Sequence, residues 1–240
     1  MILEIAVSNL EAAILAANAG AHRIELCDNL VEGGTTPSIG MVQNALQNIS
    51  IPTYPIIRPR GGHFVYSAAE FASMLYDVQA FASMGCKGIV IGILNPNGTI
   101  DVARNTQLIK AANGMQVTFH RAFDRVVNAT DALQTIIDIG CTRILTSGLQ
   151  PNVVAGASTI ANLVQQAGNQ IIIMPGSGVR SSNLAKLITT TRATEYHSSA
   201  AMPNPPHTNY HNPNMASTDG NYTTVNAAEI KAQLSIIVTA

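Results

Sequence analysis

The segment from Pro55 to Ser67 (PIIRPRGGHFVYS) carries two arginines in a pattern that suits anion binding. Arg58 and Arg60 lie two residues apart at the end of an apolar run, so on an extended backbone both side chains point to the same side. Gly61 and Gly62 follow and allow the backbone to turn sharply beside a ligand. Two guanidinium groups beside such a turn can hold a carboxylate or a phosphate.

The alternative interpretation of the two arginines is structural. Both could neutralise buried carboxylates of neighbouring strands, and Glu4 and Glu25 are the carboxylates that the chain supplies. The two interpretations are compatible if the arginines and the carboxylates together form the floor of one pocket.

Other polar residues recur where predicted strands end. Strand alternation places Glu25 on one face with Cys27, and Thr118 on one face with His120. His120 is a candidate general acid or base, or a metal ligand, and a hydrogen-bonded core histidine is the alternative. Polar groups at the ends of buried strands cost desolvation unless they find partners. The candidate catalytic residues are Glu25, His120 and Asp124, and the candidate substrate-binding residues are Glu4, Arg58, Arg60, Thr118, Ser147, Gly176, Gly178, His197 and Ser198.

The run Pro175–Val179 (PGSGV) follows the seventh predicted strand. Its glycines can aim backbone N–H groups at an anion, and many barrels bind phosphate in this region. A tight turn from strand to helix also needs glycines for steric reasons, so this motif alone does not decide the matter.

Cys27 is the cysteine predicted to lie at the C-terminal end of a strand, which makes it the candidate metal ligand. Cys86 and Cys141 begin their strands and are expected to be inert core residues. Cu(I) prefers Cys, Met and His, so Cys27 with His120 or His197 is a possible copper site. A late loop holds further soft donors, although a solvated loop is the interpretation that we prefer; these are Met202, His207, His211 and Met215.

The elements that position these residues are eight apolar segments that alternate with helices. The predicted strands are 2–7, 21–27, 51–58, 86–94, 115–120, 141–147, 171–174 and 194–198. The predicted helices are about 10–19, 39–47, 68–84, 101–112, 129–139, 158–167, 182–190 and 227–238. A doubly wound open sheet usually shows a GxGxxG motif after its first strand, but here VSNLEAA follows. The pattern therefore predicts an α/β fold with a TIM-barrel-like (β/α)8 parallel barrel. We expect one domain over residues 1–240, with a long loop at about 200–226 on the C-terminal face of the barrel.

Composition excludes several classes of partner. The net charge of the 240-residue chain is −1, which predicts no attraction to nucleic acid or to an anionic membrane. No apolar run reaches the roughly 20 residues of a membrane span. The N-terminus, MILEIAVSNLEAA, lacks the basic region of a signal peptide. Three widely spaced cysteines without a CxxC pair fit a reducing compartment, so we expect a cytoplasmic protein.

Several motifs together resemble the CutC family, which is named for copper homeostasis. They are RIELC (23–27), EGGTTPS (32–38), PIIRPRGG (55–62), VTFHRAFD (117–124), ILTSG (144–148), MPGSGV (174–179) and EYHSSA (195–200). The resemblance implies a TIM-barrel-like fold, a cytoplasmic location, a role in copper handling and a homo-oligomer, either a dimer or larger. Cys27 matches one of two cysteines proposed as copper ligands in family members, and Ala6 occupies the position of the other. His63 stands where family members commonly have an acidic residue.

Two hypotheses follow. In one, the protein binds copper ions through Cys27, with His120 as a further ligand. In the other, it is an enzyme for a small phosphorylated or carboxylated molecule, with His120 or Glu25 as acid or base. Arg58, Arg60 and the turn at 176–178 would then hold the anion. No lysine falls at the end of a predicted strand, which argues against a Schiff-base aldolase.

Overall fold

The computed structural model describes residues 1–204, 210, 212, 214 and 222–239. The eight strands that the sequence predicts are present, although most are shorter than expected. They are β1 (Ile2–Val7), β2 (Arg23–Leu26), β3 (Thr53–Pro55), β4 (Gly88–Ile91), β5 (Gln116–Phe119), β6 (Arg143–Thr146), β7 (Ile172–Pro175) and β8 (Glu195–Ser198). The helices are α1 (Leu10–Asn18), α2 (Ile39–Asn48), α3 (Ala68–Ser83), α4 (Val102–Ala111), α5 (Ala129–Asp138), α6 (Ala157–Ala167), α7 (Ser181–Thr191) and α8 (Ala227–Thr239). Two short 3-10 helices, η1 (Leu30–Glu32) and η2 (Arg121–Arg125), follow β2 and β5.

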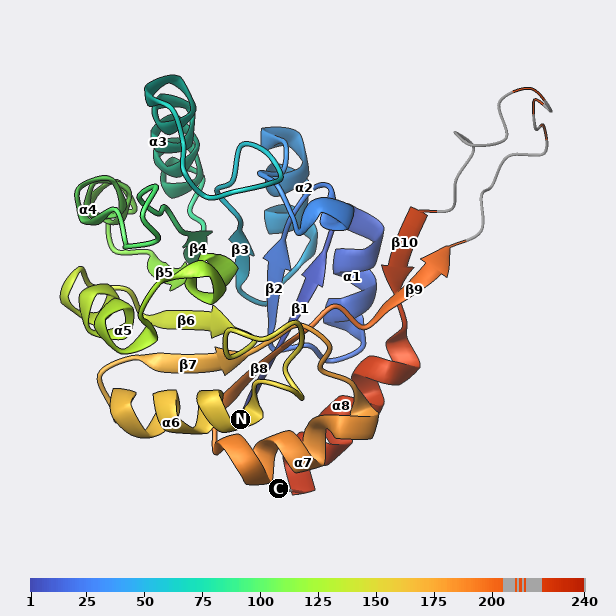
Figure 1. Ribbon diagram of the computed structural model, residues 1–240. Helices are drawn as coiled ribbons and strands as arrows, with labels where there is room; N and C mark the ends of the chain where they lie inside the picture. Colours follow the sequence, from blue (N-terminus) through green and yellow to red (C-terminus); the bar gives the residue numbers. More distant parts are fainter. Residues whose placement is uncertain (205–209, 211, 213, 215–221, 240) are drawn as a thin grey trace.

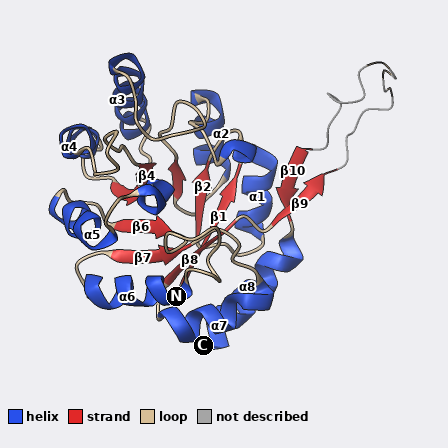
Figure 2. Ribbon diagram, in the orientation of Figure 1, coloured by secondary structure: helices blue, strands red, loops and turns tan. Residues whose placement is uncertain are grey.

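The strands lie in chain order around a ring. Within each of two sheets, β3-β2-β1-β8 and β4-β5-β6-β7, neighbouring strands are parallel. A parallel bridge between Ile56 and Val90 joins β3 to β4, and β7 contacts β8. The helices surround the strands (Figures 1 and 2). The predicted TIM-barrel-like α/β architecture is therefore confirmed.

Local sequence explains where the helices begin. A capping box begins α3, because Ser67 accepts from the Glu70 amide and the Glu70 carboxylate accepts from the Ser67 amide. Asn9 caps α1, and its side chain accepts from the amide of Ala12.

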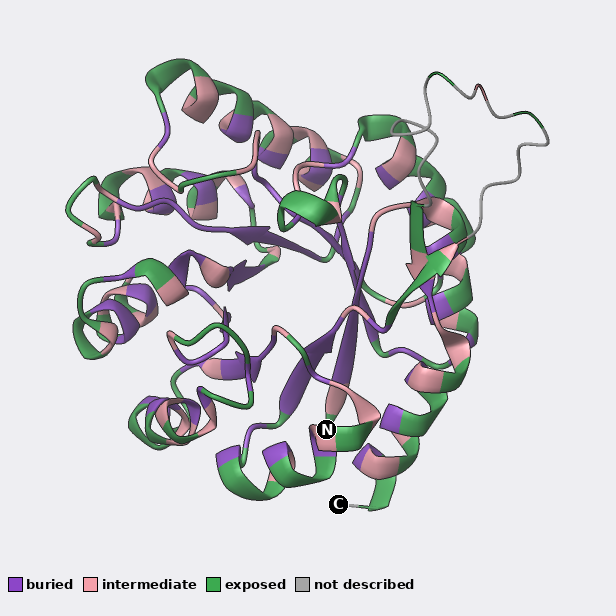
Figure 3. Ribbon diagram, turned by 45° about the vertical axis from the view of Figure 1, so that its right-hand side comes forward, coloured by how far each residue is buried: buried purple, intermediate pink, exposed green. Residues whose placement is uncertain are grey.

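The apolar core lies between the strands and the helices. Strand residues that face outward pack under the helices, and the outer faces of the helices are exposed (Figure 3). Leu3, Ile5, Ile24, Phe119 and Tyr196 are among its fully buried members. This shell holds the barrel together, so the inner face of each strand is free to carry other residues.

The inside of the barrel holds an ion network. Arg23 of β2 is paired with Glu4 of β1, and its Nη2 lies 2.5 Å from Oε2 of Glu195. Arg143 of β6 approaches the same Glu195 oxygen, with its Nε at 2.9 Å. The rings of many barrels are filled by branched apolar side chains, so charged groups here need close partners. The two arginines balance the charges of Glu4 and Glu195. The Cζ atoms of Arg23 and Arg143 also lie 5.2 and 5.6 Å from the centroid of the Tyr54 ring.

A hairpin interrupts the segment that was predicted to be a loop. The strands β9 (Ala201–Asn204) and β10 (Tyr222–Val225) pair antiparallel, and α1 contacts β10. Sequence analysis did not predict these strands. The candidate soft ligands His207, His211 and Met215 lie outside the described residues, whereas Met202 lies in β9 and is exposed. The assignment of all 240 residues to one domain stays a prediction. Within the described ranges, no helix combines the length and apolar character needed to cross a membrane.

The ion network predicts that Arg23→Met destabilises the fold by about 3–5 kcal/mol, because Glu4 and Glu195 would each lose a buried partner. Denaturant unfolding of both proteins measures the difference. Arg125→Met is the matched control, since Arg125 is exposed and makes no ion pair with another described residue; its effect should stay within about 0.5 kcal/mol. Equal stability of the two variants would contradict the interpretation of the network.

Candidate functional site

A pocket of about 1030 Å³ lies above the C-terminal ends of the strands. Its wall is formed by segments that follow β2, β3, β4, β5, β7 and β8. The polar residues among those that line it are Glu25, Glu32, Arg58, His63, Asn95, His120, Arg121, Arg125, Ser177, His197, Ser199 and Thr223. The C-terminal face of the barrel, where the barrel prediction places the active site, therefore carries a pocket with many polar residues in its lining.

Glu25 and His197 lie at the base of this pocket, with Glu4 buried next to them. The Nδ1 atom of His197 lies 2.7 Å from Oε1 of Glu4, and its Nε2 lies 3.7 Å from Oε2 of Glu25. Burial raises the pKa of Glu4, but Arg23 and then His197 outweigh burial and lower it to about 2. Glu4 is thus a permanent carboxylate that accepts the Nδ1 hydrogen of His197, which leaves Nε2 facing Glu25.

Glu25 and His197 are buried neighbours that influence each other's pKa, and they are called the proton-sharing pair below. Burial raises the pKa of the Glu25 carboxyl, with His197 opposing the effect. Burial lowers the pKa of His197, but the charge of Glu25 and the contact with Glu4 outweigh it, so the pKa is raised above 6.5. Two neighbouring groups whose pKa values are shifted toward the neutral range are the usual makings of an acid–base pair.

Cys27 is buried beside this pair and behaves as a protonated thiol. Its Sγ donates to Oε2 of Glu25 over 3.5 Å. Burial, reinforced by the charge of Glu25, raises the pKa of the thiol well above 9.0. A metal ligand would need the thiolate, so the surroundings of Cys27 oppose Cu(I) binding.

The donors gathered at the base of the pocket are two carboxylates and one imidazole. Glu4, Glu25 and His197 each offer one atom in a group that spans no more than 4.8 Å, and all three residues are buried. Carboxylate and imidazole ligands suit zinc or manganese better than Cu(I), which prefers sulfur. A two-cysteine copper site has no counterpart here, because Ala6 occupies the second position. The residues present do not fit a tight Cu(I) centre.

Arg58 lies in the pocket wall and fastens the loops around it. Its Nη1 donates to the carbonyls of Glu32 and Gly34 at 2.8 and 2.7 Å, and its Nη2 donates to the carbonyl of Gly62 at 3.0 Å. Its Cζ lies 5.1 Å from the centroid of the Phe64 ring. The suggestion that Arg58 neutralises Glu4 and Glu25 is wrong, because Arg58 binds backbone carbonyls of loops.

Arg60 points away from the pocket. Its Nε donates to the Glu70 carboxylate at 2.5 Å, and its other nitrogens donate to the carbonyls of Gly61, His63 and Val65. The structural interpretation expected a carboxylate partner for Arg60, and that partner is Glu70 in place of Glu4 or Glu25. Arg23 and His197 supply the compensation of Glu4 that was assigned to Arg58 and Arg60.

His120 lines the pocket, but its ring is held by the backbone. Nδ1 accepts a hydrogen bond of 3.1 Å from the amide of Ala122, and Nε2 is buried without a partner in the described part of the chain. Burial, and then the charge of Arg58, lower the pKa of His120 to about 3. His120 is therefore neutral at physiological pH, which does not suit the acid or base role predicted for it.

Asp124 joins two loops and does not line the pocket. Its carboxylate accepts from the hydroxyls of Thr146 and Ser147 at 2.5 and 2.9 Å, and from the amides of Ser147 and Leu149. Arg121 also donates to it, at 2.8 Å. Both oxygens of Asp124 are engaged in holding these segments, and the Ser147 hydroxyl is one of their partners. The catalytic role of Asp124 and the substrate-binding role of Ser147 stay predictions.

Three more of the predicted binding residues serve the scaffold. Thr118 accepts from Arg143 inside the barrel. Ser198 donates to the carbonyl of Val179 and accepts from Gln233 of α8. Gly176 donates its amide to Thr146, and a side chain there would collide with Leu145, because an added Cβ would lie 2.4 Å from Cδ1. Of the predicted site residues, those that line the pocket are Glu25, Arg58, His120, Gly178 and His197.

The mouth of the pocket is positively charged on one side. Arg125 is exposed there and makes no ion pair within the described residues, and Arg121 lies beside it in η2. On the loop that follows β7, Ser177 and Gly178 have φ angles of 72° and 93°, and neither amide donates a hydrogen bond to a described residue. Free guanidinium and amide groups around one opening suit an anion.

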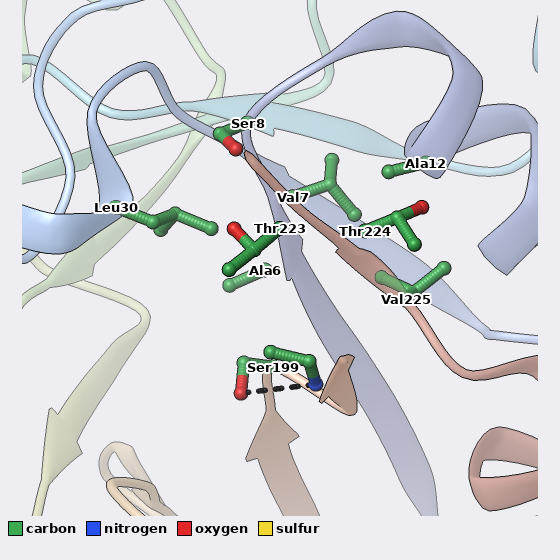
Figure 4. Close-up of a pocket in the computed structure, with 10 residues that line it drawn as sticks. Ala6, Val7, Ser8, Ala12, Leu30, Ser199, Thr223, Thr224 and Val225 are labelled. Carbon is green, nitrogen blue, oxygen red and sulfur yellow. Dashed lines mark hydrogen bonds between the residues drawn. The ribbon is translucent and has the colours of Figure 1, made fainter. Parts of the chain in front are cut away.

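The base of the hairpin forms another part of the wall. Figure 4 shows Thr223 beside Ala6 of β1, with Leu30 to one side and Ser199 below. The side chain of Asn9 donates to the carbonyl of Thr223 at 3.4 Å, which ties the hairpin to the start of α1. Ala201 and Thr223 both line the large pocket, so residues far apart in the sequence close one side of it.

Sequence analysis named Glu4 and Glu25 as carboxylates at the floor of a pocket, but it missed Arg23 and Glu195 of the ion network and Arg125 at the mouth. Strand alternation could have found part of the floor, since Arg23 lies two residues before Glu25 and Glu195 lies two residues before His197. Arg125 carried no such signal, because its position depends on the path of the loop after β5.

Comparison with known proteins identifies relatives along the chain. The model of the CutC family matches residues 1–202. A CutC protein of Chromobacterium violaceum is 47% identical over 199 residues, which cover 83% of this chain and 81% of the relative. A CutC protein of Xanthomonas campestris is 40% identical over 238 residues, 99% of each chain. A Streptococcus agalactiae protein, whose crystal structure is named for CutC and copper homeostasis, superposes with a TM-score of 0.79 at 33% identity and covers 83% of this chain and 98% of its own.

The proton-sharing pair predicts that stability falls as pH rises. The pKa of His197 is above 6.5 in the folded protein, so its stabilisation is complete below that pH and is lost as pH rises through the folded pKa. The raised pKa of Glu25 acts in the same direction. The slope for one proton is at most about 1.4 kcal/mol per pH unit.

Denaturant unfolding from about pH 6 to about pH 9, across the range where histidine titrates, tests this dependence. His197→Asn keeps a donor for Glu4 but cannot titrate, so its slope should be flatter than that of the wild type. His63→Asn is the control, because His63 is exposed, and its slope should match the wild type. A slope unchanged by His197→Asn would show that the pair does not share a proton.

Proposed function

The chain belongs to the CutC family, and we propose that its molecular activity is to bind a small anionic metabolite in the pocket and transfer a proton on it. The observation that supports this most directly is the buried Glu4–His197–Glu25 arrangement at the base of a pocket with arginines at its mouth. An acid–base pair is useful only where a ligand can reach it, and Glu25 and His197 both line the pocket.

Glu25 is the proton carrier in this proposal. Glu4 fixes the orientation of His197 through Nδ1, and Nε2 of His197 then faces the Glu25 carboxylate. Glu25 can accept a proton from one atom of the ligand and return the same proton to another atom of that ligand, so the protons balance within the site. The His197 cation beside Glu25 favours the carboxylate that takes the proton up and that is regained when the proton returns.

The mouth of the pocket would select the charge of the ligand. Arg125 has no ion-pair partner among the described residues. On the loop that follows β7, the amides of Ser177 and Gly178 donate no hydrogen bond to a described residue. A carboxylate or a phosphate satisfies both kinds of donor. The pocket of about 1030 Å³ is large enough for a small metabolite.

Thermal melting with a series of small carboxylates and with phosphate tests the anion site. The wild type should melt at a higher temperature with at least one of these anions, because a ligand that binds only the folded state stabilises it. Arg125→Met should weaken the binding of that anion by about tenfold or more, since a charge-assisted hydrogen bond is lost. Lys186→Met, which removes a positive charge on α7 away from the pocket, is the control and should respond like the wild type. A wild type indifferent to every anion would exclude the proposal.

A second proposal concerns copper. Family membership relates the chain to a protein named for copper homeostasis, and we propose that this protein takes part in that process in the cytoplasm, as a homo-oligomer. Direct binding of copper ions would use Cys27, the cysteine that is closest to the pocket. The protonated thiol and the hard donors around it support weak binding of Cu(I).

Competition with a Cu(I) chelator measures this affinity. Binding should be weak in the wild type and weaker still in Cys27→Ala, because the thiol is the soft ligand at the site. Cys141→Ala is the control, since burial also raises the pKa of Cys141, to about 12, and that residue lies two positions before the start of β6, at the far end of the barrel. Tight stoichiometric binding that survives Cys27→Ala would exclude Cys27 as the principal ligand.

A further inference from the structure

One nitrogen of His120 is fixed and the other is free. The amide of Ala122 donates to Nδ1 at 3.1 Å, while Nε2 makes no hydrogen bond with any described residue and has no contact with solvent. Gly92 allows this ring position, because an added Cβ there would lie 2.4 Å from Cε1 and 2.5 Å from Nδ1. The Nδ1–Cε1 edge therefore packs against the end of β4, which leaves the opposite edge toward other neighbours.

The contact with Ala122 decides which nitrogen carries the hydrogen. A backbone amide can only donate, so Nδ1 must present its lone pair. Burial and the nearby Arg58 lower the pKa of the ring to about 3, so the ring is neutral and its single hydrogen is on Nε2. His120 is thus a fixed donor, in contrast to His197, whose proton is shared with Glu25.

The neighbours of Nε2 within the chain do not supply an acceptor. The Phe64 ring lies 4.9 Å from the imidazole, centroid to centroid, and the Arg58 Cζ lies 5.1 Å from the centroid of the same Phe64 ring. A guanidinium has no acceptor atom. Leaving a buried N–H without a partner is costly, and such orphans are rare in native proteins. All three side chains line the pocket, so the missing acceptor can come from a ligand.

We propose that His120 donates its Nε2 hydrogen to an anionic oxygen of the bound ligand, and that it acts as a neutral positioning donor for that oxygen. This inference rests on the proposed function and adds a place for the ligand inside the pocket. The oxygen belongs to a carboxylate or a phosphate group, and the charge of the neighbouring Arg58 favours its negative charge. Because Nε2 is shielded from solvent, the proposal also requires a neighbouring side chain to move, and we assign this movement to Phe64, whose ring lies 4.9 Å from the imidazole.

Two amide substitutions separate the two nitrogens of His120. His120→Asn places its amide group near Nδ1, so it keeps an acceptor for Ala122 and lacks a donor at Nε2. His120→Gln places its amide near Nε2, so it keeps the donor and loses the acceptor. Calorimetric titration with pyruvate and with inorganic phosphate measures binding, and the two anions distinguish a carboxylate from a phosphate ligand. Thermal melting without ligand measures stability.

The proposal expects opposite behaviour from the two variants. His120→Asn should melt like the wild type and bind the anion about 10- to 100-fold more weakly, while His120→Gln should melt at a lower temperature and keep most of the affinity. Anion binding by His120→Asn equal to that of the wild type would overturn the inference and leave the proposed function standing. A wild type that binds neither anion would overturn both. Nitrogen NMR of the imidazole gives an independent test, because a hydrogen found on Nδ1 would also overturn the inference.

Discussion

The buried pairing of Arg23 with Glu4 and Glu195 is the interaction on which the site depends. Charges inside a barrel are tolerated only when each has close partners, and here two arginines face two carboxylates. The network keeps Glu4 ionised at the base of the pocket, and an ionised Glu4 fixes the orientation of His197. Burial raises the pKa of Glu25 and the charge of His197 opposes that shift, so the ion network inside the barrel also influences the proton-sharing pair above it.

The same environment separates two histidines that look alike in the sequence. Both follow or end a strand and both line the pocket. His197 lies between two carboxylates, which raise its pKa, whereas His120 lies near a guanidinium and is buried, which lowers its pKa to about 3. One histidine can therefore carry a proton, and the other can only donate the hydrogen that it already holds.

The pocket wall depends on polar side chains that hold loops by their backbones. Arg58 gathers the carbonyls of the loops after β2 and β3, and Asp124 gathers amides and hydroxyls of the loop after β6. In the sequence, both residues were candidates for the functional site, because arginine and aspartate at strand ends are common in active sites. The hydrogen-bond partners of Arg58 are backbone carbonyls, and those of Asp124 are backbone amides, two hydroxyls and the Arg121 side chain.

The sequence alone determined the fold of this protein and the face on which its site lies. Eight apolar segments alternating with helical ones leave few arrangements other than a barrel, and alternation placed Glu25 and His120 at the open ends of strands. The motifs also identified the family, because each motif is a short run of residues that can be recognised without knowing any contact in the structure.

Only the tertiary structure decided what each polar residue does. The partners of Glu4 come from β2 and β8. The strands β9 and β10 pair with each other, although no local pattern predicted either strand. Whether Arg58 binds a carboxylate, a ligand or a loop depends on distances between segments far apart in the chain. Local propensity carries no such distances, and burial, which sets the pKa of His120 and His197, exists only once the barrel has formed.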